Sequence, residues 1–306
     1  MRGDGRGASA ARVFFLAQGV VGAAWWAALP LVSDETLGAA ARVPAVAVGM
    51  LLLSAVSVCA GLRVPGAAWV SAVGMAGVGV GFGVFATITG TAGWGAVLTL
   101  VGAAGSAAAL IVDRAGRVPV ERLLVGPFRF RPTRMVGRAK VLGASGLQIL
   151  VFSAALLVGV PAALAVLEDR WGLRLEVPMP VRAAGLVVFA AAALVSVWSV
   201  VSMSVEGRGT PVPSAMPHRL VTAGPYGIVR NPMAVGGIGQ AMGVGLVAGS
   251  WMVLVYALAG AVFWHTLIRP AEEADLETRF GEQFRAYRAQ VACWVPRWRR
   301  RGPLQS

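Results

Sequence analysis

Apolar runs of about twenty residues recur along this 306-residue chain, and they constrain its fold more than any other feature. Six are single runs, at about 13–32, 43–62, 67–88, 93–112, 141–165 and 183–203. A seventh, at about 234–268, is too long for one crossing and is interrupted at Gly249-Ser250, which predicts a tight helical hairpin. The sequence therefore predicts an all-α, polytopic transmembrane protein with about eight spans.

The composition excludes an ordinary soluble domain. Hydrophobic residues make up 57% of the chain and charged residues only 13%, whereas soluble proteins carry about 25% charged residues. The formal net charge of +13 does not indicate a nucleic-acid partner, because the arginines lie between apolar runs, as the anchors of membrane proteins do. We therefore expect membrane lipids to surround the protein.

The charges of the loops predict the orientation in the membrane. Loop 113–140 holds eight basic residues against Asp113 and Glu121, a net charge of +6, whereas loop 166–182 is neutral. Basic loops stay on the cytoplasmic side. Counting spans from there, we expect a multi-pass protein of the inner (cytoplasmic) membrane with both termini and loop 204–233 in the cytoplasm. The arginine-rich tail at 297–301 agrees with this orientation.

The two halves of the chain differ in polar content. The four spans within 1–140 contain almost no ionisable residue, whereas polar residues gather in 204–296. We therefore expect an N-terminal part, 1–140, of four helices and a basic loop, and a C-terminal membrane domain, 141–306. Cys59 and Cys293 are too few and too far apart for a disulfide framework or a metal site, so no metal is expected.

A polar, broken stretch, "PHRLVTAGPYGIVRNPMAVGG" (217–237), separates the sixth run from the hairpin. Gly224-Pro225-Tyr226 predicts a turn, and Asn231 and Pro232 predict the cap and the first residue of a helix. Free N–H groups at a helix start favour an anionic group such as a carboxylate. The alternative is that these residues only shape a loop that re-enters the membrane, with His218 as an interfacial histidine.

After Pro270 the sequence predicts an amphipathic cytoplasmic tail helix over 271–290. Its apolar stripe is formed by Leu276, Phe280, Phe284 and Tyr287. Glu273 lies near the centre of that stripe and Glu272 at its edge. The two glutamates could simply favour the positive start of the helix. A carboxylate on an apolar face, however, needs a cationic partner, which Arg269 or a bound cation could supply.

Two segments together, "GTPVP…HRLVTAGPYGIVRNPM" and "EEADLETRFGEQFRAYRAQVACWVP", resemble the isoprenylcysteine carboxyl methyltransferase and phospholipid methyltransferase family of integral membrane enzymes. The resemblance covers about 204–296. It implies that S-adenosylmethionine binds on the cytoplasmic side. By this similarity the cofactor-binding residues are His218, Arg219, Leu220, Val221, Tyr226, Asn231, Pro232, Met233, Ala234 and Glu272. Arg269 and Glu273 take the catalytic roles, with Arg269 handling the substrate. Ala234 departs from the family, which often has a tyrosine there.

The resemblance implies an enzyme that moves a methyl group from S-adenosylmethionine to a lipophilic, isoprenoid- or lipid-like acceptor, in particular a carboxylate. Such a transfer is an in-line displacement, and it needs alignment of donor and acceptor and exclusion of water more than it needs a nucleophilic triad. Two alternatives stay open. One is a membrane reductase of the sterol-reductase type that uses NADPH, and the other is a transporter or scaffold without enzymatic activity.

Overall fold

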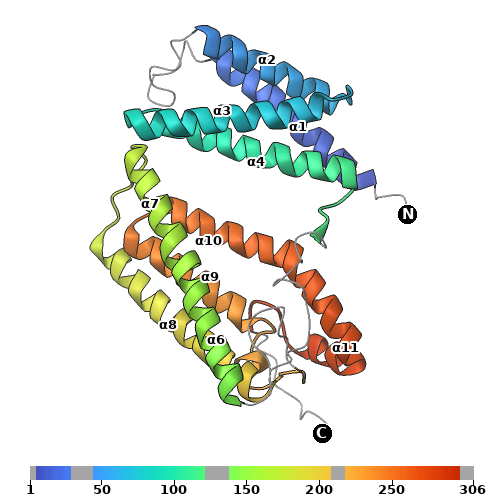
Figure 1. Ribbon diagram of the computed structural model, residues 1–306, viewed down its shortest axis with the longest axis vertical. Helices are drawn as coiled ribbons and strands as arrows, with labels where there is room; N and C mark the ends of the chain where they lie inside the picture. Colours follow the sequence, from blue (N-terminus) through green and yellow to red (C-terminus); the bar gives the residue numbers. More distant parts are fainter. Residues whose placement is uncertain (1–4, 29–43, 121–137, 208–217, 297–306) are drawn as a thin grey trace. The chain divides into compact units, whose positions relative to one another are not determined.

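The computed structural model describes residues 5–28, 44–120, 138–207 and 218–296, and every regular element in these ranges is a helix (Figure 1). Within these ranges, seven helices are long and apolar enough to cross a membrane, and an eighth apolar helix, 232–248, is shorter. The structure thus confirms the all-helical, polytopic fold. Three segments lie outside the described residues: the part of the basic loop at 121–137, the Gly/Pro-rich segment at 208–217 and the arginine-rich tail at 297–301.

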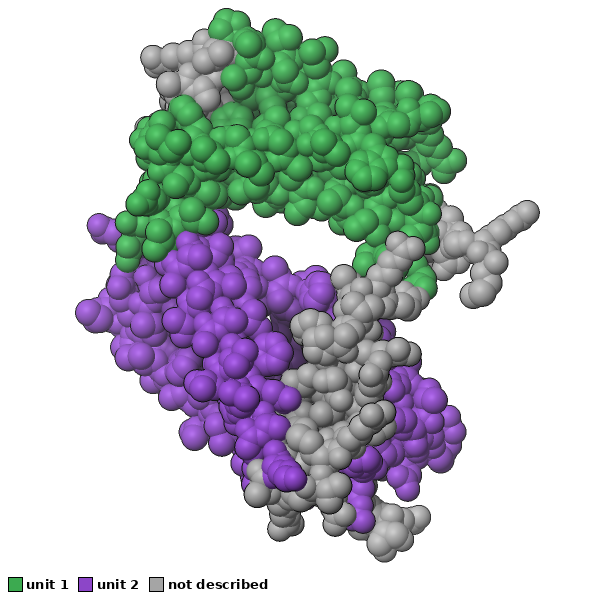
Figure 2. Space-filling model, in the orientation of Figure 1, with its two compact units in different colours: residues 1–119, 166–174 green, residues 120–165, 175–306 purple. Residues whose placement is uncertain are grey.

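The chain forms two compact units, which Figure 2 shows in different colours. The first comprises residues 1–119 and 166–174, and the second comprises 120–165 and 175–306. The segment 166–174 thus groups with the N-terminal helices, although it follows them by almost fifty residues. The boundary at 140/141 stays a prediction.

In the first unit, α1 (Gly5–Ala28), α2 (Pro44–Gly61), α3 (Ala67–Thr89) and α4 (Gly93–Ala115) are joined by a buried polar network. The amide of Gln18 donates to Ser57 Oγ at 3.0 Å and accepts from Ser106 Oγ at 2.9 Å, and Ser57 and Ser71 hydroxyls lie 2.7 Å apart. Each of the four helices contributes one of these residues. Hydrogen bonds of this kind fix the mutual register of apolar helices, which hydrophobicity alone does not do in lipid.

The second unit contains α6 (Arg138–Ser153), the π-helical turn η4 (Ala154–Gly159), the start of α7 (Val160–Arg170) and α8 (Met179–Val205). The short turn η6 (Gly224–Gly227) then leads to α9 (Pro232–Ala248) and α10 (Trp251–Phe263). Between these last two helices Gly249 has φ 66° and Ser250 caps α10 by accepting from Val253 N–H. The π-helical turn η7 (Trp264–Ile268) leads into α11 (Arg269–Gln290).

Two prolines account for the two π-helical turns. Proline lacks an N–H group and its ring clashes with the carbonyl four residues earlier. Just before Pro161, the N–H of Val160 donates to Ala155 O, five residues back. Just before Pro270, the N–H of Arg269 donates to Trp264 O, again five residues back. The diverted N–H groups leave Leu156 O and His265 O without their usual helical donors, and π turns of this kind occur often at functional sites.

The tail helix begins where the sequence predicts it, but it is not continuous. Gly281 has φ 51° and ψ −120°, a conformation that suits glycine, and it breaks α11 into two segments. Phe284 and Tyr287, beyond the break, are buried, whereas Leu276 and Phe280, before it, are only half-buried. The single apolar stripe predicted across 276–287 is therefore wrong, because it assumes one uninterrupted helix.

Candidate active site

Asn231 joins the start of α9 to α11. Its side-chain oxygen accepts from the N–H of Ala234 at 2.9 Å, which confirms the predicted cap, and Pro232 is the first helical residue. Its amide nitrogen donates to Glu272 Oε2 at 3.2 Å. One short side chain thus serves both helices and links two residues that are 41 positions apart in the sequence.

Arg230, immediately before this cap, is the main partner of Glu273. Its Nη2 donates to Glu273 Oε1 at 2.9 Å, and both side chains are largely shielded, with 12% and 19% exposed. Its Nη1 donates to the carbonyls of Arg288 and Val291, and its backbone N–H to Ala292 O. Arg230 therefore binds both the first part of α11, at Glu273, and the residues at and after its end, at Arg288, Val291 and Ala292.

Arg269, the partner expected for Glu273, is farther away. Its Nη1 lies 3.7 Å from Glu273 Oε1, and its Nε donates to the His265 carbonyl freed by the π turn. Sequence reasoning thus missed Arg230. Arg230 could have been considered from the sequence. It directly precedes the predicted helix cap at Asn231, so any carboxylate that approaches this helix start also lies near Arg230.

Tyr226 lies in η6 and is buried. Its backbone carbonyl accepts a hydrogen bond of 2.7 Å from Tyr287 Oη. Its own hydroxyl is buried and finds no hydrogen-bond partner within the part of the chain that the structure describes. Burial raises the pKa of Tyr226, and Glu272 and Tyr287 raise it further. The hydroxyl therefore stays neutral and can donate to a bound polar group.

Glu272 carries a perturbed carboxyl group outside the apolar part of its helix. The helical run 251–290 has 40 residues and is broken at Gly281; its part before the break, about 45 Å long, already exceeds the hydrocarbon core of about 30 Å. Only its apolar first part, before Arg269, suits lipid. Burial raises the pKa of Glu272 to about 7, and the charges of Glu273 and Asp275 add to the rise, whereas Arg279 and the hydrogen bond from Asn231 oppose it.

The remaining residues expected at the cofactor lie in the same loop or in the first turn of α9. His218 and Arg219 are exposed, Leu220 is half-buried and Val221 is buried. Pro232 is buried, and Met233 and Ala234 are half-buried. The structure thus brings Tyr226, Asn231, Glu272 and Glu273 to one place through hydrogen bonds and neighbouring charges. For His218 to Val221, a role in binding stays a prediction.

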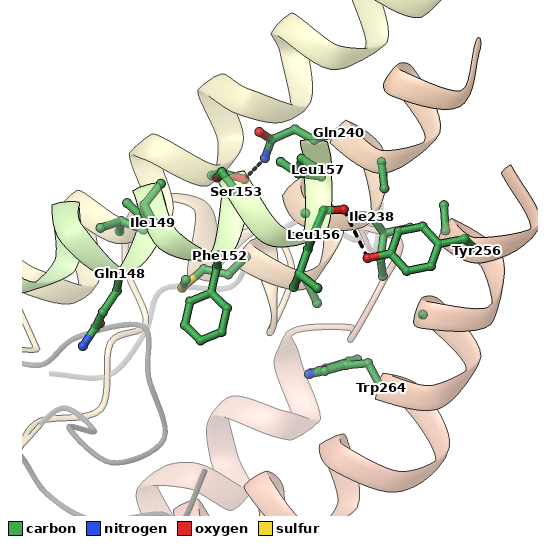
Figure 3. Close-up of a pocket in the computed structure, with 18 residues that line it drawn as sticks. Gln148, Ile149, Phe152, Ser153, Leu156, Leu157, Ile238, Gln240, Tyr256 and Trp264 are labelled. Carbon is green, nitrogen blue, oxygen red and sulfur yellow. Dashed lines mark hydrogen bonds between the residues drawn. The ribbon is translucent and has the colours of Figure 1, made fainter. Parts of the chain in front are cut away.

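A cavity of about 400 Å³ opens beside the first turn of α9. Met233 and Ala234 line it, together with residues of α6, η4, α8, α10 and η7 (Figure 3). Among the described residues that line it, the side chains are mainly apolar, with Gln148, Ser153, Ser196, Gln240 and Tyr256 as polar exceptions. This cavity is not visible in the sequence, because its walls come from three separate apolar runs that show no polar periodicity.

The sequence model of the phospholipid methyltransferase family matches residues 181–283. The match runs from α8 through the loop of Tyr226 and Arg230 to just beyond the Gly281 break in α11, so it includes both sides of the Asn231–Glu272 contact. It confirms the family resemblance drawn from the sequence. Neither the curated proteins nor the solved structures gave a match to this chain.

Proposed function

We propose that this chain is a membrane methyltransferase that uses S-adenosylmethionine and methylates a lipophilic acceptor, in particular a carboxylate, at the cytoplasmic face. The proposal is supported by the match of residues 181–283 to the phospholipid methyltransferase model and by the seven candidate membrane spans within the described residues. The observation that carries the proposal is the meeting of Asn231 and Glu272 beside an apolar cavity. The polar contact of Asn231 and Glu272 suits a charged, water-soluble donor. The apolar cavity suits a lipophilic acceptor.

The residues present fit the donor chemically. S-adenosylmethionine, when bound, supplies a methyl group activated by a positively charged sulfur. Glu272 offers a carboxylate to a cation, and its Oε2 is already oriented by Asn231. The hydroxyl of Tyr226 and the Nε of Arg230 are both buried without a partner among the described residues, so each can donate to a polar ligand group. Buried donors of this kind are costly unless something binds them.

The ion pair of Glu273 and Arg230 stabilises this arrangement. Their ion pair fixes the position of the neighbouring Glu272 along the same helix turn and keeps the tail segment on the loop. We place the acceptor in the cavity, with its reacting end at Met233 and Ala234. To Arg269, whose Nη1 lies 3.7 Å from Glu273 Oε1, we assign the orientation of an acceptor carboxylate. The packed helices around the cavity exclude water from the transferred methyl group.

Transfer of a labelled methyl group tests the proposal. The purified protein, incubated with S-[methyl-³H]adenosylmethionine and lipid extract, is expected to label the lipid fraction. Glu272→Gln is expected to reduce labelling about 10- to 100-fold, because it removes a charge-assisted contact. Glu282→Gln is the matched control, since that side chain is 81% exposed on the same helix. Equal labelling by both variants would remove Glu272 from the site, and stabilisation by NADPH but not by S-adenosylhomocysteine would favour a reductase.

Cofactor affinity is expected to depend on pH through Glu272. Its pKa is about 7 without a ligand, and a bound cation favours the charged carboxylate, so binding releases a proton below that pH. Affinity for S-adenosylhomocysteine, whose ammonium group is the cation, should therefore rise from pH 5.5 to about 7 and then level off. Isothermal titration at several pH values measures this. Glu272→Gln should flatten the slope, and an unchanged slope would contradict the assignment.

A further inference from the structure

We infer that the cavity beside α9 is a slot of fixed length for a single linear lipid chain, and that Tyr256 and Gln240 form the end wall that sets the longest chain accepted. The inference rests on the proposed function and names the substrate class of the same site. It assigns to these two residues a part in selecting the acceptor, a role that the family match does not specify.

The helices give the cavity two distinct ends. In the α9–α10 hairpin the two helices run in opposite directions, so Met233 on α9 and Trp264 after α10 lie at one end. Ala241 and Tyr256 lie at the other, nearer the Gly249 turn. From Met233 to Ala241 is eight residues, or about 12 Å along the helix axis. The first end adjoins Asn231 and Glu272, and the second lies away from them.

Two hydrogen bonds close the far end (Figure 3). Tyr256 Oη donates to Leu156 O at 3.1 Å, which joins α10 to η4. Gln240 Nε2 donates to Ser196 Oγ at 2.8 Å, which joins α9 to α8. All four of these residues line the cavity. Four of the elements that line the cavity are thus tied in pairs, and we place the end wall at these two contacts.

The proline-induced turn makes the Tyr256 contact possible. The usual helical donor to Leu156 O is the N–H of Val160, but this group donates to Ala155 O instead. The next residue, Pro161, has no N–H to offer. Leu156 O is therefore left to accept from the hydroxyl of Tyr256. A wall fixed by backbone geometry does not yield easily to a longer ligand.

The near end is also fixed. Trp264 lies in the second π turn, and its ring packs edge-on against Trp294 with centroids 5.2 Å apart. Trp294 Nε1 donates to His265 Nδ1 at 2.8 Å. The backbone N–H of Arg230 donates to the carbonyl of Ala292, two residues before Trp294. Both ends of the slot are therefore held while the chain's reacting end lies at Met233. A volume of about 400 Å³ is near the low end for ligand pockets, and it suits one chain.

Binding of linear isoprenoid carboxylic acids of two, three, four and five isoprene units tests the slot. The full chain in detergent is expected to bind progressively better up to one length and then at least about tenfold more weakly with the next unit. Tyr256→Ala should move this limit to a longer acid. Tyr256→Phe, which keeps the ring but loses the hydrogen bond to Leu156 O, should move the limit less than Tyr256→Ala does. Leu258→Ala, at a side chain 54% exposed on the same helix, should leave it in place.

Tyr256→Trp keeps the test decisive if Tyr256→Ala does not fold, because added bulk should move the limit to a shorter acid. Affinity that rises through all four lengths, or a limit unchanged in both Tyr256→Ala and Tyr256→Trp, would overturn the slot. Methyl transfer to the same acids is measured in parallel. A length limit without any methylated product would contradict the proposed reaction on these acids while supporting the slot, so the two failures are distinguishable.

Discussion

Replacing Arg230 by methionine is expected to lower the free energy of unfolding by about 3 kcal/mol and to abolish binding of S-adenosylhomocysteine. The substitution leaves the largely shielded Glu273 with only Arg269 at 3.7 Å, and it removes the donors to the carbonyls of Arg288 and Val291. A shielded charge without its partner costs more than an exposed one because water cannot replace the lost contact. Thermal unfolding in detergent and isothermal titration measure the two effects.

Arg285→Met provides the matched control for this prediction. Arg285 also makes short contacts with carboxylates, at 2.7 Å to Glu282, but its side chain is 49% exposed and that of Glu282 is 81% exposed. Exposed pairs contribute little, about 0–1 kcal/mol. The double variant Arg230→Met/Glu273→Gln should recover part of the lost stability, because no unpaired charge then remains. If Arg230→Met and Arg285→Met cost the same, Arg230 does not anchor the site.

Much of the fold follows from hydrophobicity and length alone. The runs predicted at about 67–88 and 93–112 correspond to helices 67–89 and 93–115, since a bilayer-crossing segment has few alternatives to a helix. The first run, predicted at about 13–32, begins earlier, at Gly5. Arg6 and Arg12 are polar, so hydropathy places the start of the span too late even though they continue the helix.

The cap at Asn231 was predictable because its signal is local, with a side chain and a backbone N–H three residues apart. The partner of Glu273 was not predictable in this way. Arg230 is 43 residues away in the sequence and Arg269 is four, and only the approach of the loop to α11 places Arg230 closer. The break at Gly281 was missed because a single glycine inside a helical pattern is usually tolerated.

The π turns were predictable from the sequence only in part. Pro161 and Pro270 are visible in the sequence, and a proline inside an apolar run signals a local departure from the α-helix. What the sequence does not show is which carbonyl is freed and what binds it. The carbonyl of Leu156 accepts from the hydroxyl of Tyr256, 100 residues later, and the carbonyl of His265 accepts from the Nε of the nearby Arg269. The cavity between the two turns therefore becomes visible only in three dimensions.

The contact between α8 and α9 places the cap at Asn231, and it depends on glycine. A Cβ atom on Gly243 would lie 2.7 Å from both the N and the Cβ of Phe189 and 2.8 Å from its Cα. On the facing helix, a Cβ on Gly185 would lie 2.7 Å from the Cβ of Leu246. Small residues let helix backbones approach closely in lipid, where packing rather than hydrophobicity drives association. The position of α9 is thus set by the absence of side chains on this face.

Gly243→Val is therefore expected to destabilise the protein by about 3 kcal/mol and to reduce methyl transfer strongly, because α9 must move away from α8 and carry Asn231 with it. Phe189→Ala in the same background should restore little, since two of the three nearest atoms belong to the backbone of residue 189. Gly146→Val on α6 is the control: no heavy atom lies within 4 Å of its Cβ position. Equal melting temperatures for the two valine variants would show that α8 and α9 are not in close contact.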